Sequence, residues 1–263
     1  WRSNPLAQQG LPRHMLRLWQ GVQKEIARQE LQFVFGYVKA DNERTLGLLH
    51  KFGAKKVDEK EFLTMPVHAR FSRDQARVSQ VLLTRTIDPQ REAAILREKY
   101  GNLDFFSEIS QSADLMQQRQ DYLFGKLSYE KSSVKIWDTN AEYTQRVLNM
   151  PLVYKVLRPA VHAASKIVSL PRIPRLGDEI RVWQLYDLIL DQPDHLFYLL
   201  ERARLAAKEN NIDYLVICMS TGDGGYEQAA SKAWVRLKYH VIFVPMTELP
   251  MPKAPTYFDV SYL

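Results

Sequence analysis

The residues best suited to chemistry in this sequence form a turn near its start. The turn consists of Gln8, Gln9, Gly10, Leu11 and Pro12, and Arg13 follows it. Proline is favoured at the first position of a helix, because the N–H group that it lacks would have no partner there. The N–H groups at the start of a helix point toward any anion bound in front of it, so the turn predicts an anion-binding site.

The elements that would position this turn follow it directly. Apolar residues recur at helical spacing from Met15 to Ile26, and residues 31–38 form an apolar run typical of a buried strand. Asn42 then stands where it can cap a second helix over residues 45–52. Another strand is predicted over residues 57–67.

A unit of this order needs neighbouring strands, and residues 1–7 are too short and irregular to supply them. We therefore expect the chain to begin within the fold of its first domain, which would span residues 1–67. His68–Ala76 is polar and basic, and we interpret it as a solvated linker. A second domain is predicted over residues 77–263.

The second domain is predicted to combine strands and helices. Strands are expected at 78–86, 180–190, 212–219, 239–244 and 257–263, and helices at 89–100, 107–124, 196–207 and 227–237. A weak hairpin or irregular strands are expected over 125–137, a broken helical pattern over 141–168 and an extended segment over 170–175. Because residues 178–245 repeat the element order of residues 8–67, the sequence predicts a pseudo-duplicated α/β (α+β) fold with mixed twisted sheets flanked by helices.

The composition is that of an ordinary globular protein. Of 263 residues, 36 are lysine or arginine and 30 are aspartate or glutamate, which gives a net charge of +6. This mild positive charge suits an anionic ligand but requires none. The single cysteine, Cys218, excludes an internal disulfide. No signal peptide or membrane span is visible, so we expect an intracellular protein, cytoplasmic or nuclear.

The turn at Gly10, the helix and strand that follow, and Asn42 eleven residues before Gly53 are together similar to the acetyl-CoA-binding half of the GNAT acyltransferase superfamily. The resemblance covers about residues 6–67. It implies that Gln8, Gln9, Gly10, Leu11, Pro12 and Arg13 hold the pyrophosphate of acetyl-CoA, and that Asn42, with Thr45 beside it, contacts the CoA arm. The first domain would then be the carboxyl part of a GNAT domain.

The rest of the chain resembles the plant Hookless-type N-acetyltransferase-like proteins, which pair a GNAT domain with a degenerate GNAT-like one. The resemblance rests on residues 65–70, 170–174 and 257–260. It implies an acetyl-CoA-dependent N-acetyltransferase that transfers directly to an amine of a protein or small molecule. The alternative is a non-catalytic interaction or regulatory protein on a decayed GNAT fold.

Two departures from the GNAT pattern bear on catalysis. Pro12 replaces a glycine and removes one N–H from the anion site, and Leu49 stands where many of these enzymes carry a tyrosine that protonates the thiolate. His50 is adjacent to Leu49, but one residue along a helix turns a side chain by about 100°. The catalytic acid and base therefore stay unassigned, and the acceptor and the oligomeric state stay open.

Other candidate sites are weaker. No histidine has a cysteine or carboxylate at ligand spacing, so no metal site is predicted. The turn 191–195 lacks glycine and is expected to bind no CoA, whereas the loop 220–225 could bind an anion or simply turn the chain. Tyr186 and Asp187 either line an acceptor cleft or pack in the core. The arginines within residues 70–77 lack aromatic residues at regular spacing, so nucleic-acid binding is not favoured.

Overall fold

We describe the protein from a computed structural model, which covers residues 13–68, 70–106, 117–149, 174–248 and 250–257, together with 156, 158, 159 and 161. The chain forms two compact units. One takes its residues from 1–60 and 238–254, and the other from 61–237 and 255–263. Two long strands contribute residues to both units.

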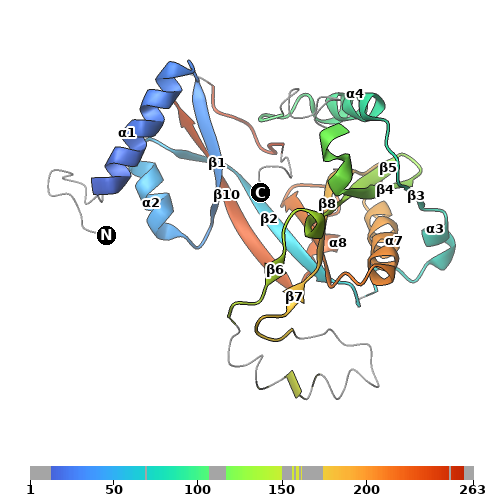
Figure 1. Cartoon of the computed structure of the whole chain (residues 1–263). Helices are drawn as coiled ribbons and strands as arrows, with labels where there is room; N and C mark the ends of the chain where they lie inside the picture. The colour runs from blue at the N-terminus through green and yellow to red at the C-terminus, as the bar shows by residue number, and fades with distance from the viewer. Residues whose placement is uncertain are drawn as a thin grey trace. The chain divides into compact units, whose positions relative to one another are not determined.

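The first unit follows the element order that the sequence predicts. Helix α1 (Arg13–Arg28) leads to strand β1 (Phe33–Lys39), helix α2 (Glu43–Lys51) and strand β2 (Lys55–Pro66), as Figure 1 shows. Strand β10 (Val235–Pro245) pairs antiparallel with β1 along the whole length of β1, from Phe33 opposite Pro245 to Lys39 opposite Tyr239. Leu46 and Leu49 of α2 pack with Ala54, Ile242 and Val244 to form a small core.

The second unit has strands at its centre and helices on both faces. Its strands are β3 (Leu82–Thr84), β4 (Leu123–Tyr129), β5 (Ser132–Asp138), β8 (Val182–Ile189) and β9 (Tyr214–Ser220), beside the end of β2. Its helices are α3 (Gln75–Ser79), α4 (Pro89–Tyr100), α7 (His195–Glu209) and α8 (Tyr226–Ala230), with short 3₁₀ turns η1 (Arg119–Tyr122) and η2 (Thr139–Ala141). A separate two-stranded ladder joins β6 (Gln145–Arg146) to β7 (Glu179–Ile180).

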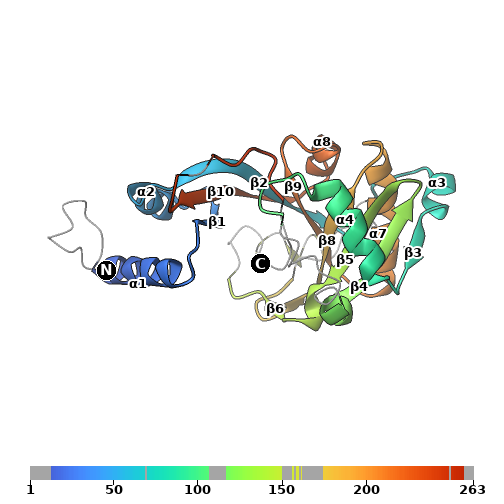
Figure 2. The same ribbon diagram turned by 90° about the horizontal axis from the view of Figure 1, so that it is seen from above.

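Apart from β6 and β7, the described strands form one mixed sheet in the order β1-β10-β2-β9-β8-β5-β4-β3. The pairs β3–β4, β4–β5 and β5–β8 are antiparallel, whereas β8 and β9 are parallel. In the second unit α7 packs against the face of β4 and β5 that carries Leu127, Val134 and Ile136. Helix α4 lies over the opposite face of these strands (Figures 1 and 2).

The sequence locates some elements well. The predicted helix over 89–100 is confirmed to the residue, because Asp88 accepts hydrogen bonds from the N–H groups of Gln90 and Arg91 and Pro89 stands in the first turn. The strands expected at 31–38, 180–190 and 212–219 and the helix at 196–207 are also confirmed within a few residues. The hairpin expected to be weak is β4–β5, which lies inside the sheet.

Four predicted elements differ from the structure. The expected strand 78–86 begins instead as helix α3, capped by Asp74, and only Leu82–Thr84 pairs with β4. In the described end of the expected helix 107–124, residues 117–118 are helical, but η1 and then β4 follow. Residues 141–149 of the expected helical segment contain β6, which pairs with β7. The expected helix 227–237 ends at Ala230, and Val235 already belongs to β10.

Several predicted segments fall outside the described residues. They are all of 107–116, most of 150–173 and most of the last strand, 257–263, of which only Tyr257 is described.

The expected solvated linker is wrong for its central residues, because Phe71 and Ser72 are buried. The N–H group of Phe71 donates a hydrogen bond of 2.8 Å to the carboxylate of Glu201, which is itself fully buried. Arg204 binds the same carboxylate at 2.7 Å and 3.0 Å. A buried carboxylate on α7 therefore fixes this segment within the second unit.

Glu201 predicts how stability responds to acid. Burial raises the pKa of this carboxyl, but Arg204 and the N–H groups of Phe71 and Ser72 outweigh burial, so its pKa is lowered. A lowered pKa in the folded state gives stability that is present above the unfolded pKa of about 4.3 and is lost as pH falls further. We expect Glu201→Gln to be less stable at neutral pH and to lose less stability between pH 5 and 3 than the parent chain. Urea unfolding across this range measures both, and equal acid slopes would contradict the assignment.

Candidate functional site

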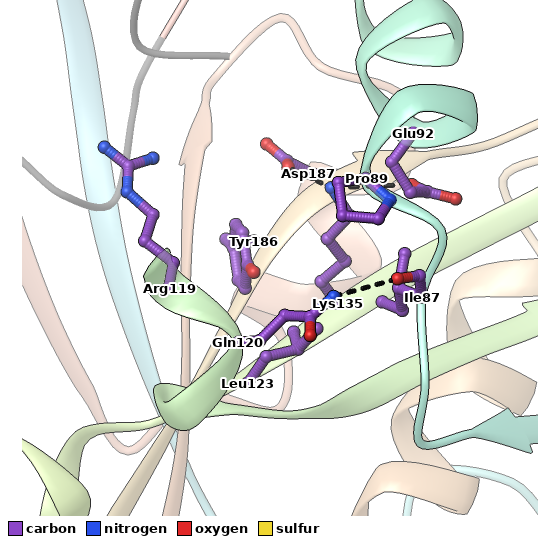
Figure 3. Close-up of a pocket in the computed structure, with 9 residues that line it drawn as sticks. All are labelled: Ile87, Pro89, Glu92, Arg119, Gln120, Leu123, Lys135, Tyr186 and Asp187. Atoms are coloured by element: carbon purple, nitrogen blue, oxygen red, sulfur yellow. Dashed lines mark hydrogen bonds and ion pairs between the residues drawn. The ribbon is translucent and has the colours of Figure 1, made fainter. Parts of the chain in front are cut away.

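A small hollow in the second unit lies between the start of α4 and the face of the sheet that α7 does not cover. Its volume is about 30 Å³, enough for a water-sized group. Figure 3 shows its lining residues, which are Ile87, Pro89, Glu92, Arg119, Gln120, Leu123, Lys135, Tyr186 and Asp187. The side-chain amide of Gln120 donates to the carbonyl of Ile87 at 3.0 Å and so joins η1 to the segment before α4.

Lys135 is the central charge of this hollow. Val134 and Ile136 on either side of it point into the core, so the alternation of a strand turns Lys135 to the opposite face. Its Nζ atom lies 2.9 Å from Oδ2 of Asp187 and 3.4 Å from Oε2 of Glu92. Figure 3 shows the ammonium group beside both carboxylates.

A second lysine completes the network. Nζ of Lys126 lies 2.5 Å from Oε1 of Glu92, so two lysines face two carboxylates and their charges cancel. The side chains of Lys135, Glu92 and Asp187 are almost fully buried, and buried charges are tolerated only when they are paired in this way. In this state neither carboxylate is available as a base for an entering amine without displacing a lysine.

Strand β8 changes its course where it reaches the hollow. Its parallel pairing with β9 extends from Val182 to Leu185, although the strand continues to Ile189. Asp187 has a φ of +50°, and the register with β5 shifts close to this point. The backbone of β8 beyond Leu185 therefore needs other partners.

Aromatic residues supply these partners. The hydroxyl of Tyr100 donates to the carbonyl of Leu188 at 2.5 Å, and the hydroxyl of Tyr257 donates to Oδ1 of Asp187 at 2.8 Å. Burial and then the charge of Asp187 raise the pKa of Tyr100, so its phenol stays protonated and acts as a donor. The rings of Tyr100 and Tyr257 are also in contact, with centroids 5.2 Å apart.

Tyr186 and Asp187 both line this hollow. The sequence leaves open whether they line an acceptor cleft or pack in the core, and the carboxylate of Asp187 also binds Lys135 and Tyr257. The sequence did not reveal Lys135, Lys126 and Glu92. The sequence contains one sign of this network, which is a lysine at position 135 inside the apolar stretch 134–137. A lysine buried in such a stretch needs a carboxylate beside it, because an unpaired buried charge is costly.

The predicted cofactor residues belong to the first unit. Gln8, Gln9, Gly10, Leu11 and Pro12 lie outside the described residues, and Arg13 begins α1. Asn42 is the N-cap of α2, and its Oδ1 accepts a hydrogen bond of 3.1 Å from the N–H of Thr45. The structure therefore brings Asn42 and Thr45 together through a capping bond.

Variants of Asn42 separate capping from cofactor binding. Asn42→Asp keeps an N-cap acceptor, so we expect stability within about 0.5 kcal/mol of the parent, whereas Asn42→Ala is expected to cost about 1 kcal/mol. If Asn42 also donates to a CoA group, the aspartate variant should bind acetyl-CoA at least tenfold more weakly while remaining as stable as the parent. Thermal unfolding and calorimetric titration on the same samples test this, and unchanged affinity would restrict Asn42 to capping.

The other candidate residues have structural partners. In the loop 220–225 the carboxylate of Asp223 accepts a hydrogen bond from the N–H of Ser220, so a side chain of the loop itself binds the backbone at the start of the loop. Arg77 donates to the hydroxyl of Tyr198 at 2.6 Å. Cys218 is half-buried in β9. Among the helices that the structure describes, none is long and apolar enough to cross a membrane.

Comparison with known proteins identifies the fold. No protein-family model matches the sequence, and no curated protein matches it. The N-myristoyltransferase of Saccharomyces cerevisiae, solved with myristoyl-CoA, is 8% identical, with a TM-score of 0.50 over 92% of this chain and 58% of its own. GCN5-related N-acetyltransferases from Kribbella flavida and Sphaerobacter thermophilus match 86% of this chain and 46% and 62% of theirs, at 10% and 9% identity and TM-scores of 0.47.

This chain therefore spans less than two thirds of the length of these three structures. At such low identity the likeness establishes the fold alone. The fold class expected from the sequence is confirmed as a mixed α/β sheet flanked by helices, with eight strands among the described residues, and this fold is similar to that of the N-myristoyltransferase.

Proposed function

We propose that this chain is an acetyl-CoA-dependent N-acyltransferase, or the cofactor-binding part of one, that acts on an amine of a protein or small molecule. The observation that carries the proposal is the arrangement of the first unit. Helix α1 is described from Arg13, which follows the predicted turn at Gly10 in the sequence, and β1 then leads to an Asn42-capped helix. This is the order in which a helix N-terminus and a nearby amide would meet a CoA pyrophosphate and its arm.

The residues proposed for the cofactor are Gln8 to Arg13, Asn42 and Thr45. The N–H groups of the turn residues other than Pro12 would bind the pyrophosphate, and Asn42 and Thr45 would contact the CoA arm. The thioester would then be attacked directly by the amine nitrogen. The nitrogen forms a bond to the acyl carbon, the carbon–sulfur bond breaks, and the amine proton ends on the departing thiolate. We assign no side chain of the chain as the acid or base of this step.

An assay of CoA release tests the activity. The full chain would be incubated with acetyl-CoA and a panel of peptides and small amines, and free thiol would be followed with a chromogenic disulfide. We expect release that depends on the amine and is lost in Gly10→Glu. Release at the rate of the enzyme-free control for every amine, in a chain that still binds acetyl-CoA, would contradict catalysis and favour the alternative.

The alternative is a non-catalytic interaction protein on the same fold. It is favoured by the packing of Leu49, which contributes to the small core of the first unit at the position where a tyrosine acid would be expected. The mutual neutralisation of the lysines and carboxylates around Lys135 favours it as well. The Hookless-type relationship remains part of the proposal, because the comparisons support the fold and nothing finer.

A further inference from the structure

Three side chains that can bind metal meet at the start of α7. Glu130 lies in the turn between β4 and β5, Asp191 lies in the segment after β8, and His195 is the first residue of α7. One ligand atom of each lies within 4.8 Å of those of the other two. Nε2 of His195 is 3.7 Å from Oε2 of Glu130, which is too long for a hydrogen bond. Two ligands of one tetrahedral Zn²⁺ ion are about 3.4 Å apart, so a small shift of the exposed carboxylates would suffice.

The orientation of His195 is a second observation that points to a ligand. Its side chain is only 6% exposed, and Tyr129 packs edge-on against the ring at 4.8 Å. Nδ1 lies 2.9 Å from Oγ of Ser132, which leaves Nε2 directed at the carboxylate of Glu130. No described residue forms a hydrogen bond with Nε2. In a metal-binding histidine a hydrogen bond to the other ring nitrogen usually fixes the orientation of the ring, and the contact between Nδ1 and Ser132 fills that role for His195.

Ser132 holds two of the three residues in place. Besides contacting His195, its hydroxyl oxygen accepts a hydrogen bond of 2.8 Å from the N–H of Asp191. Ser132 is itself buried, so it is suited to position its neighbours and not to act as a nucleophile. The start of a helix weakly disfavours a cation, but two carboxylates in direct contact with the ion outweigh a screened helix dipole.

We propose that Glu130, Asp191 and His195 bind one divalent transition-metal ion, and that this ion fastens the β4–β5 turn to the start of α7. One imidazole nitrogen and two carboxylate oxygens suit Zn²⁺, whereas Ca²⁺ and Mg²⁺ prefer oxygen ligands only. Water would complete the coordination. The sequence predicts no metal site; Asp191 and His195 are four residues apart in the sequence, but Glu130 comes from the distant turn between β4 and β5. The proposal is independent of the acyltransferase function.

The test is a titration of the full chain, stripped of metal with a chelator and dialysed, with ZnCl₂ in a calorimeter. We expect saturable binding at one site and a rise in the melting temperature as the site fills. Glu130→Gln and Asp191→Asn are each expected to weaken binding at least tenfold. Co²⁺ as a second probe should give the intense visible absorption of a tetrahedral site that includes a histidine, and this absorption should disappear in His195→Gln.

Asp194→Asn is the matched control, because it removes an exposed carboxylate at the same helix end that is not part of the cluster. Its affinity for Zn²⁺ should stay within twofold of the parent. Absence of saturable binding would overturn the proposal, and so would unchanged affinity in Glu130→Gln. An equal loss in Asp194→Asn and Glu130→Gln would also overturn it, because it would show general attraction to negative charge. If His195→Gln fails to fold, the two exposed carboxylate variants still decide the outcome.

Discussion

Replacing Lys135 with methionine is expected to lower the free energy of unfolding by about 3 to 5 kcal/mol, because it leaves the buried carboxylate of Asp187 without its lysine. The side chains of Lys135, Asp187 and Glu92 are between 4% and 7% exposed, so water cannot replace the lost partner. Methionine has a similar length, which confines the change mainly to the charge. Urea unfolding at neutral pH, followed by tryptophan fluorescence, measures the loss.

Two further variants identify the cause of this loss. Combining Lys135→Met with Asp187→Asn removes both charges, and asparagine tolerates the φ of +50° at this position. The double variant should therefore recover a large part of the stability, which a double-mutant cycle quantifies. Lys131→Met removes an exposed lysine four residues earlier and should change stability by less than about 0.5 kcal/mol. A loss below 1 kcal/mol in Lys135→Met would contradict the role given to the buried network.

Replacing Gly10 with glutamate is expected to weaken acetyl-CoA binding at least a hundredfold. The new carboxylate would stand where the proposed site holds a pyrophosphate, and like charges at close range repel strongly when water is partly excluded. The prediction follows from the proposed position of the turn at the start of α1. Calorimetric titration of the parent and the variant with acetyl-CoA, with circular dichroism to verify folding, measures the effect.

Gly21→Glu provides the matched control for this variant. Gly21 lies within α1, its position is exposed, and a side chain added there meets no atom within 4 Å. The control changes the net charge by the same amount but lies away from the helix start. It should leave the affinity within about threefold, a small change expected from long-range repulsion alone. Equal weakening in both variants would mean that net charge, and not a site at Gly10, controls binding.

Local signals predict the local elements of this fold. Asp88 and Pro89 specify the start of α4, and Asn42 and Gly53 delimit α2, because caps and left-handed residues act within one turn of a helix. The errors occur where tertiary pairing decides. Val78 is apolar and is expected in a strand, but Asp74 caps helix α3, which contains it. The last apolar residues of the helix predicted over 107–124 belong to β4 instead.

Contacts between distant segments could not be predicted in the same way. Strand β10 pairs with β1 across most of the chain, and no periodic pattern specifies that partner. The network around Lys135 joins α4, β4, β5 and β8, and the cluster at His195 joins the β4–β5 turn to the start of α7 through Ser132. In both places the sequence contains the chemical groups, while the sheet order brings them together.

The most direct test of the proposed function is a calorimetric titration of the full chain with acetyl-CoA. Titrations with free acetate and with buffer alone serve as blanks. The account predicts saturable binding of one acetyl-CoA per chain, competed by CoA and lost in Gly10→Glu but not in Gly21→Glu. No detectable binding at millimolar acetyl-CoA, by a chain whose folding circular dichroism confirms, would contradict it.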